Sequence, residues 1–222
     1  MNQKERSFSI IMTVYDQASE LRDNLPMFLT QEYEPGYEVI VIDETSTDET
    51  SDVLKLLKED YPHLYTTFLP KPHSPQIRKK KMAINLGIKA AKHDWLIITK
   101  IGNKPWAEDV LKVMDEVIDK HAELTLGYFT KKGMTLQSFA DCHDARFHIL
   151  KTERRLKKIT ERRRLKFAWG RYDFIIIRKD QALEILKYYE EQIPAKTLQG
   201  YRLRIFWKNL FAHESITHLF KG

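Results

Sequence analysis

Residues 38–50 read EVIVIDETSTDET, an apolar run that ends in a cluster of acidic and hydroxyl side chains. The apolar residues are continuous rather than alternating, which is typical of a strand that is covered on both faces. Residues 46–49, STDE, match the capping pattern that begins a helix. The stretch therefore predicts a buried strand and then a helix, with Asp43 and Glu44 at the carboxyl end of the strand.

The same strand–helix unit recurs through the first two-thirds of the chain. Strands are predicted over 8–14, 64–70 and 95–99, and helices over about 21–29, 78–92 and 106–120. Pro26 indicates that the first of these helices starts near this residue or kinks there. Strand–helix alternation predicts a parallel sheet with right-handed crossovers.

The last third has a different pattern. Residues 124–130 and 172–179 resemble strands, and 181–191 resemble a helix. In the tail, 200–222, apolar residues recur at helical spacing with Arg and Lys between them, which predicts an amphipathic C-terminal helix. The alternative is that the aromatic residues of this tail, Phe206, Trp207 and Phe211, cap the sheet.

Composition indicates a globular chain of one domain. It has 222 residues, of which 42% are apolar and 11% aromatic. The single Cys142 excludes an internal disulfide and a Cys-based zinc set. No apolar run approaches the roughly 18 residues of a membrane span, and the N-terminal apolar stretch is too short for a signal peptide. We therefore expect a cytoplasmic protein.

The net charge of +6 is concentrated in residues 151–171, which contain ten Lys and Arg residues. Such a segment attracts polyanions, although a solvated helix face is the alternative. The chain has no recognised nucleic-acid module, so the pattern disfavours RNA or DNA. Together with the tail, the segment predicts peripheral contact with an anionic membrane at its inner face.

Four motifs occur in order along the chain: SIIMTVYDQ at 9–17, QEY at 31–33, EVIVIDETSTDET at 38–50, and Asn85 with Gly87 in the 78–92 helix. In this order and spacing they resemble the inverting glycosyltransferases of family 2, over residues 7 to about 115. The resemblance implies an α/β fold of GT-A (Rossmann-like) type, with a mixed, mainly parallel sheet flanked by helices. It also implies an enzyme that uses a nucleoside diphosphate sugar.

The resemblance assigns a nucleotide site to the strand ends. Thr13 and Tyr15 would bracket the base, and Asp43 or Glu44 would hold uracil or ribose, with Glu44 in place of the usual Asp. Arg78 and Lys79, with the two lysines that follow, would lie near the diphosphate. The alternatives are packing for Tyr15, a turn that begins a helix for the two carboxylates, and surface charge for the basic cluster.

The stretch WLIITKIGNKP, 95–105, departs from the family pattern. Lys100 and Gly102 stand where the family has an acidic pair that coordinates Mg²⁺ or Mn²⁺, and Asn103 offers one neutral oxygen. Hard divalent cations need oxygen ligands and an ammonium repels them, so we expect no metal-binding residues here. Lys100, Lys104 and the 78–81 cluster can instead stabilise the diphosphate, since a unit charge at about 4 Å contributes roughly 4 kcal/mol at an effective dielectric constant of 20.

Inverting transfer needs a general base, usually Asp or Glu. The family motif that supplies it has no clear match, and Asp173 and Asp144 are the candidates. The predicted organisation is one domain, 1–222, with a nucleotide-binding half (1–120), an acceptor-side half (121–199) and the tail. The predicted function is transfer of a sugar to a glycan or lipid-linked acceptor in cell-surface polysaccharide biosynthesis. The alternative is an inactive nucleotide- or glycan-binding relative that partners an active transferase.

Overall fold

The computed structural model describes residues 6–70, 79–103, 105, 107–118, 124–130, 174–187 and 203–209, with 124–130 and 203–209 described by their backbone. The elements in chain order are β1 (Phe8–Val14), α1 (Ala18–Leu29), β2 (Tyr37–Asp43), α2 (Thr50–Asp60), β3 (Leu64–Phe68), α3 (Lys79–Ala90), β4 (Trp95–Thr99), α4 (Val110–Val117), β5 (Leu124–Thr130), β6 (Phe174–Arg178), α7 (Lys179–Leu186) and β7 (Leu203–Asn209).

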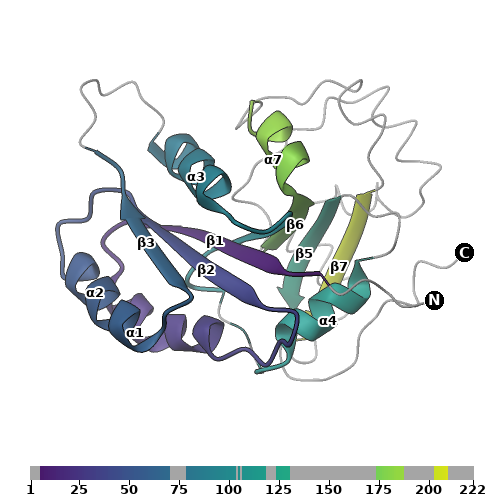
Figure 1. Ribbon diagram of the computed structural model, residues 1–222, viewed down its shortest axis with the longest axis horizontal. Coiled ribbons are helices and arrows are strands. Elements are labelled where there is room, and N and C mark those ends of the chain that lie inside the picture. Colours follow the sequence, from purple (N-terminus) through teal and green to yellow (C-terminus); the bar gives the residue numbers. More distant parts are fainter. Residues whose placement is uncertain are drawn as a thin grey trace, which may run out of the picture.

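The strands form one mixed sheet in the order β3-β2-β1-β4-β6-β5-β7 (Figure 1). The first four are mutually parallel, β6 runs antiparallel to both its neighbours, and β5 and β7 are parallel to each other. The predicted mixed, mainly parallel sheet is therefore confirmed. Because of the register, the ends of β1 and β2 meet at the Val14–Asp43 pair, and the end of β4 meets the start of β6 at Thr99–Phe174.

Helices cover both faces of the sheet, with α1, α2 and α4 on one face and α3 and α7 on the other (Figure 1). Successive strand residues face opposite layers, so Ile10 and Met12 pack toward α1 whereas Ile11 packs toward α3. Both layers are apolar, which explains why the central strands read as continuous apolar runs. No helix among the described residues is both long and apolar enough to cross a bilayer.

Two predicted helices differ in their bounds. Helix α1 begins at Ala18 and continues through Pro26 to Leu29. Its buried residues Leu21, Leu25 and Phe28 anchor it to the core, so tertiary packing outweighs the hydrogen bond that proline cannot donate. Helix α4 is shorter than predicted, Val110–Val117.

The predicted amphipathic C-terminal helix is wrong over 203–209. These residues form β7, which pairs in parallel with β5 from Leu124–Leu203 to Thr130–Asn209. Ile, Phe and Trp favour strands, and the ladder with β5 satisfies backbone groups that a helix would have paired internally. The membrane-binding helix therefore cannot include this stretch, and 210–222 lies outside the described residues.

Candidate functional site

The candidate site lies at the carboxyl ends of β1, β2 and β4, where parallel α/β sheets bind ligands. Pairing continues to the end of the strands, because the Glu44 N–H donates to the Val14 carbonyl oxygen at 2.8 Å. Tyr15 follows β1 directly and half of its surface is exposed (50%). An aromatic ring held at this position presents a face on which a base can stack.

The loops after β1 and β2 are joined by reciprocal hydrogen bonds. The Asp16 carboxylate accepts from the Thr47 N–H at 2.7 Å, and the Ser46 hydroxyl accepts from the Asp16 N–H at 2.9 Å. Asp16 and Thr45 have left-handed backbones, with φ of 49° and 68°. Such a conformation is strained for a β-branched residue such as Thr45, and it persists where the surroundings fix it.

Asp48 holds the first turns of two helices. One of its carboxylate oxygens accepts from the Thr50 N–H in α2 and the other from the Ala18 N–H in α1, each at 3.0 Å. The hydrogen bond from the Thr50 side chain, and then those from backbone N–H groups, lower the pKa of Asp48 below its ordinary value. The charged carboxylate is thus part of the folded loop.

Asp43 is buried, and its carboxylate forms hydrogen bonds within the loop after β2. Its Oδ1 accepts from both the N–H and the hydroxyl of Ser46, at 2.8 and 2.6 Å. These are the bonds of a turn that begins a helix, which was the alternative for this carboxylate. Glu44 is the next residue and is half-buried at the same edge.

Lys79, at the start of α3, lies beside Tyr15. Its ammonium nitrogen is 5.8 Å from the centroid of the Tyr15 ring, and it donates to the Thr45 hydroxyl at 3.4 Å. The cation–π geometry orients the ring while leaving it half exposed. Three elements, β1, the loop after β2 and α3, therefore meet at this aromatic side chain.

A cavity of about 370 Å³, open to solvent, lies between α3 and the ends of β1 and β4. Its polar lining consists of Thr13, Lys80, Thr99 and Lys100, and its apolar lining of Ile11, Met12, Ile84 and Ile98. Two lysines, one from α3 and one that follows β4, therefore line one opening.

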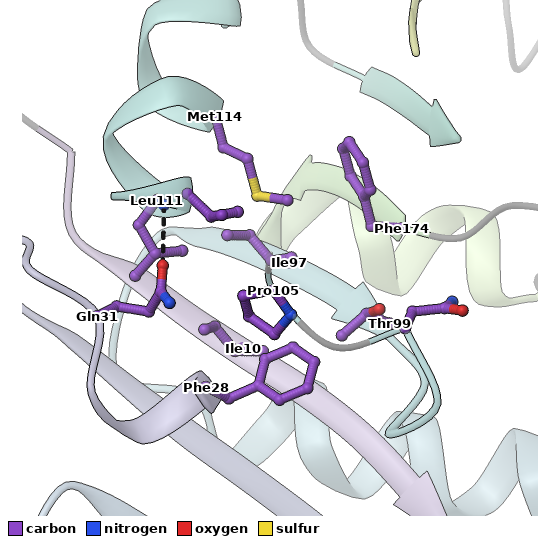
Figure 2. A pocket seen from close by; sticks show the side chains of 11 residues that line it. Ile10, Phe28, Gln31, Ile97, Thr99, Pro105, Leu111, Met114 and Phe174 are labelled. Atoms are coloured by element: carbon purple, nitrogen blue, oxygen red, sulfur yellow. Dashed lines mark hydrogen bonds between the residues drawn. The ribbon is translucent and has the colours of Figure 1, made fainter. Parts of the chain in front are cut away.

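A second cavity, of about 320 Å³, lies on the opposite face of the sheet among α1, α4, β4 and β6 (Figure 2). Its lining is mostly apolar, with Phe28, Ile97, Met114 and Phe174 around it. The buried amide of Gln31 donates to the Met27 and Ala107 carbonyl oxygens, at 2.8 and 2.9 Å.

Gln31 also accepts from the Leu111 N–H at 3.3 Å, the bond drawn in Figure 2. These three hydrogen bonds tie the end of α1 to the segment that leads from β4 into α4. The first residue of the QEY motif therefore has a structural role: its buried amide joins α1 to the start of α4.

The structure brings together only some of the predicted site residues. Thr13 and Lys100 line the first cavity, and Tyr15 and Lys79 contact each other. Asn103 lines the second cavity instead, and its N–H donates to the Lys100 carbonyl oxygen at 3.0 Å. Arg78, Lys104, Asp144 and Asp173 lie outside the described residues, so their roles stay predictions.

Lys80 is the cavity residue that the sequence did not single out within its basic cluster. The signal was present in the helical spacing, because Lys80 precedes the buried Ile84 and Ile88 at intervals of one turn. That spacing places Lys80 on the face of α3 that is turned to the sheet. The loop residues Asp16 and Asp48 were likewise missed, since their partners lie on another loop.

The residues present do not fit a divalent cation at the turn after β4. Lys100 and Gly102 replace the carboxylates, and the described residues contain no group of three or more His, Cys, Asp and Glu that could hold a metal ion. An ammonium beside the cavity disfavours a hard cation.

A mixed sheet of this topology with its site at the strand ends defines the GT-A fold, and solved glycosyltransferases share it. A mannosyltransferase from Pyrobaculum calidifontis, solved with GDP-Man and Mn²⁺, matches with a TM-score of 0.62 and 17% identity over 93% of this chain and 57% of its own. The S. aureus protein TarS (residues 1–349), solved with UDP-GlcNAc, matches with a TM-score of 0.59 and 16% identity over 94% of this chain and 60% of its own.

Residues 9–99, which run from β1 to the last residue of β4, match the family model described as glycosyl transferase family 2. The resemblance predicted from the four motifs is therefore confirmed, and with it the predicted GT-A fold. Curated relatives are uncharacterised proteins of Mycobacterium tuberculosis and Mycobacterium bovis, 29% identical over 124 residues, which is 53% of this chain and 33% of theirs. The chain thus spans about a third of the length of these relatives.

Proposed function

We propose that the chain is a glycosyltransferase that binds a nucleoside diphosphate sugar at the ends of β1, β2 and β4. The observation that carries the proposal is the combination of the half-exposed Tyr15 ring, beside Lys79, with the adjoining cavity that contains Thr13 and Lys100. A base on the ring and a diphosphate over the cavity would give each part of the donor a chemically suited surface. The structural neighbours solved with GDP-Man and with UDP-GlcNAc support this class of ligand.

In this proposal residues 1–120 form the donor half and 121–199 the acceptor side. The sugar passes to a glycan or lipid-linked acceptor, in the assembly of a cell-surface polysaccharide at the cytoplasmic face of the membrane. An inverting transfer forms the new glycosidic bond as the bond to the nucleoside diphosphate breaks, while a base takes the proton of the acceptor hydroxyl. Asp173 and Asp144 are the proposed candidates for that base.

Donor binding is tested by thermal-shift screening of the intact chain with nucleotides and nucleoside diphosphate sugars. A ligand that binds only the folded state raises the melting temperature, by an amount that grows with ligand concentration. We expect one nucleoside diphosphate and its sugar conjugates to raise it. Tyr15→Ala should abolish that shift, whereas Tyr65→Ala, which removes an exposed tyrosine from the edge strand β3, should leave it intact.

The second candidate is a relative that binds the donor or a glycan without transferring the sugar. The replacement of the acidic pair by Lys100 and Gly102 favours it. Release of the nucleoside diphosphate from the bound donor separates the two, measured with a panel of acceptors in EDTA and in Mn²⁺. Turnover in either condition supports the transferase, and binding without turnover in both supports the binding-only relative.

Membrane contact is proposed for the basic segment 151–171. Deleting the tail does not test it cleanly, because that deletion also removes strand β7. Flotation with anionic and neutral vesicles should instead compare the native chain with a variant in which Arg162, Arg163 and Arg164 are replaced by Gln. Binding to anionic vesicles that the variant loses supports the contact, and equal flotation of both proteins contradicts it.

A further inference from the structure

We propose that the cavity at the ends of β1 and β4 binds the nucleotide diphosphate through the ammonium groups of Lys80 and Lys100, without a divalent cation. The inference rests on the proposed donor site and specifies how that site balances the charge of its ligand. It makes this chain an exception to the metal-dependent pattern that the family resemblance implies.

The two lysines come from separate elements and line the same opening. Lys80 lies in the first turn of α3, one turn before the buried Ile84, and Lys100 follows the last residue of β4. Thr13 and Thr99, at the ends of β1 and β4, are also among the residues that line it. Ammonium and hydroxyl groups are donors that suit the anionic oxygens of a diphosphate, and charge-assisted hydrogen bonds are the stronger ones.

The charge of the lining is of one sign. Among the described residues that line this cavity two are lysines and none is acidic. At these described lining residues a divalent cation would meet two lysines and no carboxylate, whereas a diphosphate would meet two cations. Fixed ammonium groups would then neutralise the leaving nucleoside diphosphate, the task that a bound metal has in the family.

The three consecutive lysines of α3 point to different partners. Lys79 donates to the Thr45 hydroxyl at 3.4 Å, and Lys81 donates to the Lys187 carbonyl oxygen at 3.1 Å, at the end of α7. Lys80 alone of the three lines the cavity. Lys81→Ala removes the same charge from the same helical turn without altering the cavity lining. Comparing Lys81→Ala with Lys80→Ala therefore separates the effect of surface charge from that of a specific contact with the diphosphate.

The turn after β4 also allows the family's acidic pair to be rebuilt. Gly102 is exposed, and a Cβ atom placed on it meets no heavy atom within 4 Å. A side chain can therefore begin at this position without a clash at Cβ. The double substitution Lys100→Asp/Gly102→Asp therefore removes one of the two cavity cations and introduces the carboxylates that a hard divalent cation prefers.

The experiment is calorimetric titration of the native chain and its variants with UDP and GDP, in EDTA and in Mn²⁺. We expect the native chain to bind at least one nucleotide in EDTA, with little gain from Mn²⁺. Lys80→Ala and Lys100→Ala should each weaken binding about tenfold or more, the loss typical of a charge-assisted hydrogen bond. Lys81→Ala should retain native affinity, and Lys100→Arg, which keeps the charge, should retain most of it.

The rebuilt pair should reverse the metal response, so that Lys100→Asp/Gly102→Asp binds weakly in EDTA and gains affinity in Mn²⁺. Circular dichroism and melting temperature verify that each variant is folded, and Lys80→Gln replaces Lys80→Ala if the latter is not. Binding by the native chain that requires Mn²⁺ overturns the inference and leaves the donor site standing. Equal losses in Lys80→Ala and Lys81→Ala also overturn it, whereas no nucleotide binding in either condition overturns the donor site itself.

Discussion

Single carboxylates in the β1 and β2 loops determine the local geometry beside the candidate site. Asp48 accepts backbone hydrogen bonds from the starts of both α1 and α2, so one side chain fixes two helices relative to each other. Asp16, in the loop after β1, accepts from the Thr47 N–H in the loop after β2 and so joins the same two loops. The exposed Tyr15 lies on this framework, and its position depends on these bonds.

Asp48 predicts a pH dependence of stability. Because hydrogen bonding lowers its folded pKa below the ordinary 3.8, its contribution is complete well above 3.8 and is lost as the pH falls through the lower folded pKa. We expect Asp48→Asn to lower the urea midpoint near neutral pH, and the difference from the native chain to shrink as the solution is acidified below 3.8. Urea titrations over a pH series measure this.

Asp52→Asn is the matched control for that series. Asp52 lies in the first turn of α2 as well, but its contact is an exposed ion pair with Lys55. Exposed pairs contribute little, so this variant should stay close to the native chain at every pH. A difference between Asp48→Asn and the native chain that stays constant into acid would contradict the assigned role.

The candidate bases Asp173 and Asp144 lead to a prediction about catalysis rather than binding. Asparagine preserves the shape of the side chain but cannot take a proton, so substitution of the true base should lower kcat by roughly 10²–10⁴ and leave the Kd for the nucleotide unchanged. Donor turnover and nucleotide titration of Asp173→Asn and Asp144→Asn test this. Two fully active variants would remove both residues as candidates.

At the scale of elements, α3 is the helix whose placement matters most for the site. It carries Lys79 and Lys80 at one end, and Gly87 lets it approach the sheet. A Cβ atom at Gly87 would meet Ile11 Cγ2 at 2.6 Å and Ile42 Cδ1 at 2.7 Å. The glycine in the family-like helix motif is thus explained by close packing on β1 and β2.

Gly87→Ala should therefore be destabilising. Overpacking costs about 1–3 kcal/mol and the higher helix propensity of alanine returns about 1 kcal/mol, which leaves a net loss of about 1 kcal/mol. Displacement of α3 should also weaken nucleotide binding. Gly102→Ala, where a Cβ atom meets nothing within 4 Å, is the control and should be nearly neutral in a urea titration. An unchanged free energy of unfolding in Gly87→Ala would contradict the close packing.

The sequence predicts the elements of residues 1–120 well and the C-terminal ones less well, for a physical reason. In this part of the chain the strands β1, β2 and β4 are buried on both faces and the helices carry buried apolar residues at helical spacing, so local patterns suffice. Residues 203–209 satisfy helical spacing but also alternate Leu203, Ile205 and Trp207, and the partner that decides between the two is β5, far away in the chain. No local pattern contains that information.

The same distinction applies to the site. Lys100 was singled out from its position at a strand end, and it lines the cavity between α3 and the ends of β1 and β4. Asn103, only three residues further on, contributes to the apolar cavity beneath the turn instead. Spacing along the chain predicts which strand end a residue follows, but the turn itself decides which face of the sheet its side chain reaches.

At the scale of the whole molecule, the C-terminal strand closes one edge of the sheet. Strand β7 pairs with β5 along its full length, and β3 forms the other edge. Removing residues 203–222 would expose the unpaired N–H and C=O groups of β5. We expect this deletion to lower the melting temperature and to increase aggregation, as measured by thermal unfolding and light scattering.

Deletion of 210–222 alone is the control, because it retains β7. This shorter deletion should leave the melting temperature close to that of the native chain. If removal of 203–222 has no larger effect than removal of 210–222, then β7 does not contribute to the folded sheet.

The antiparallel direction of β6 determines where residues 131–173 join the sheet. Thr130 lies beyond the Gly127–Phe174 pair, so the polypeptide leaves β5 and enters β6 at the same rim on which β1, β2 and β4 end. Residues 131–173 begin after the last paired residue of β5 and end before the first paired residue of β6, so this segment does not interrupt either strand. Under the proposed function, replacing residues 131–173 by the corresponding stretch of a relative should change the preferred acceptor and leave nucleotide binding unaltered.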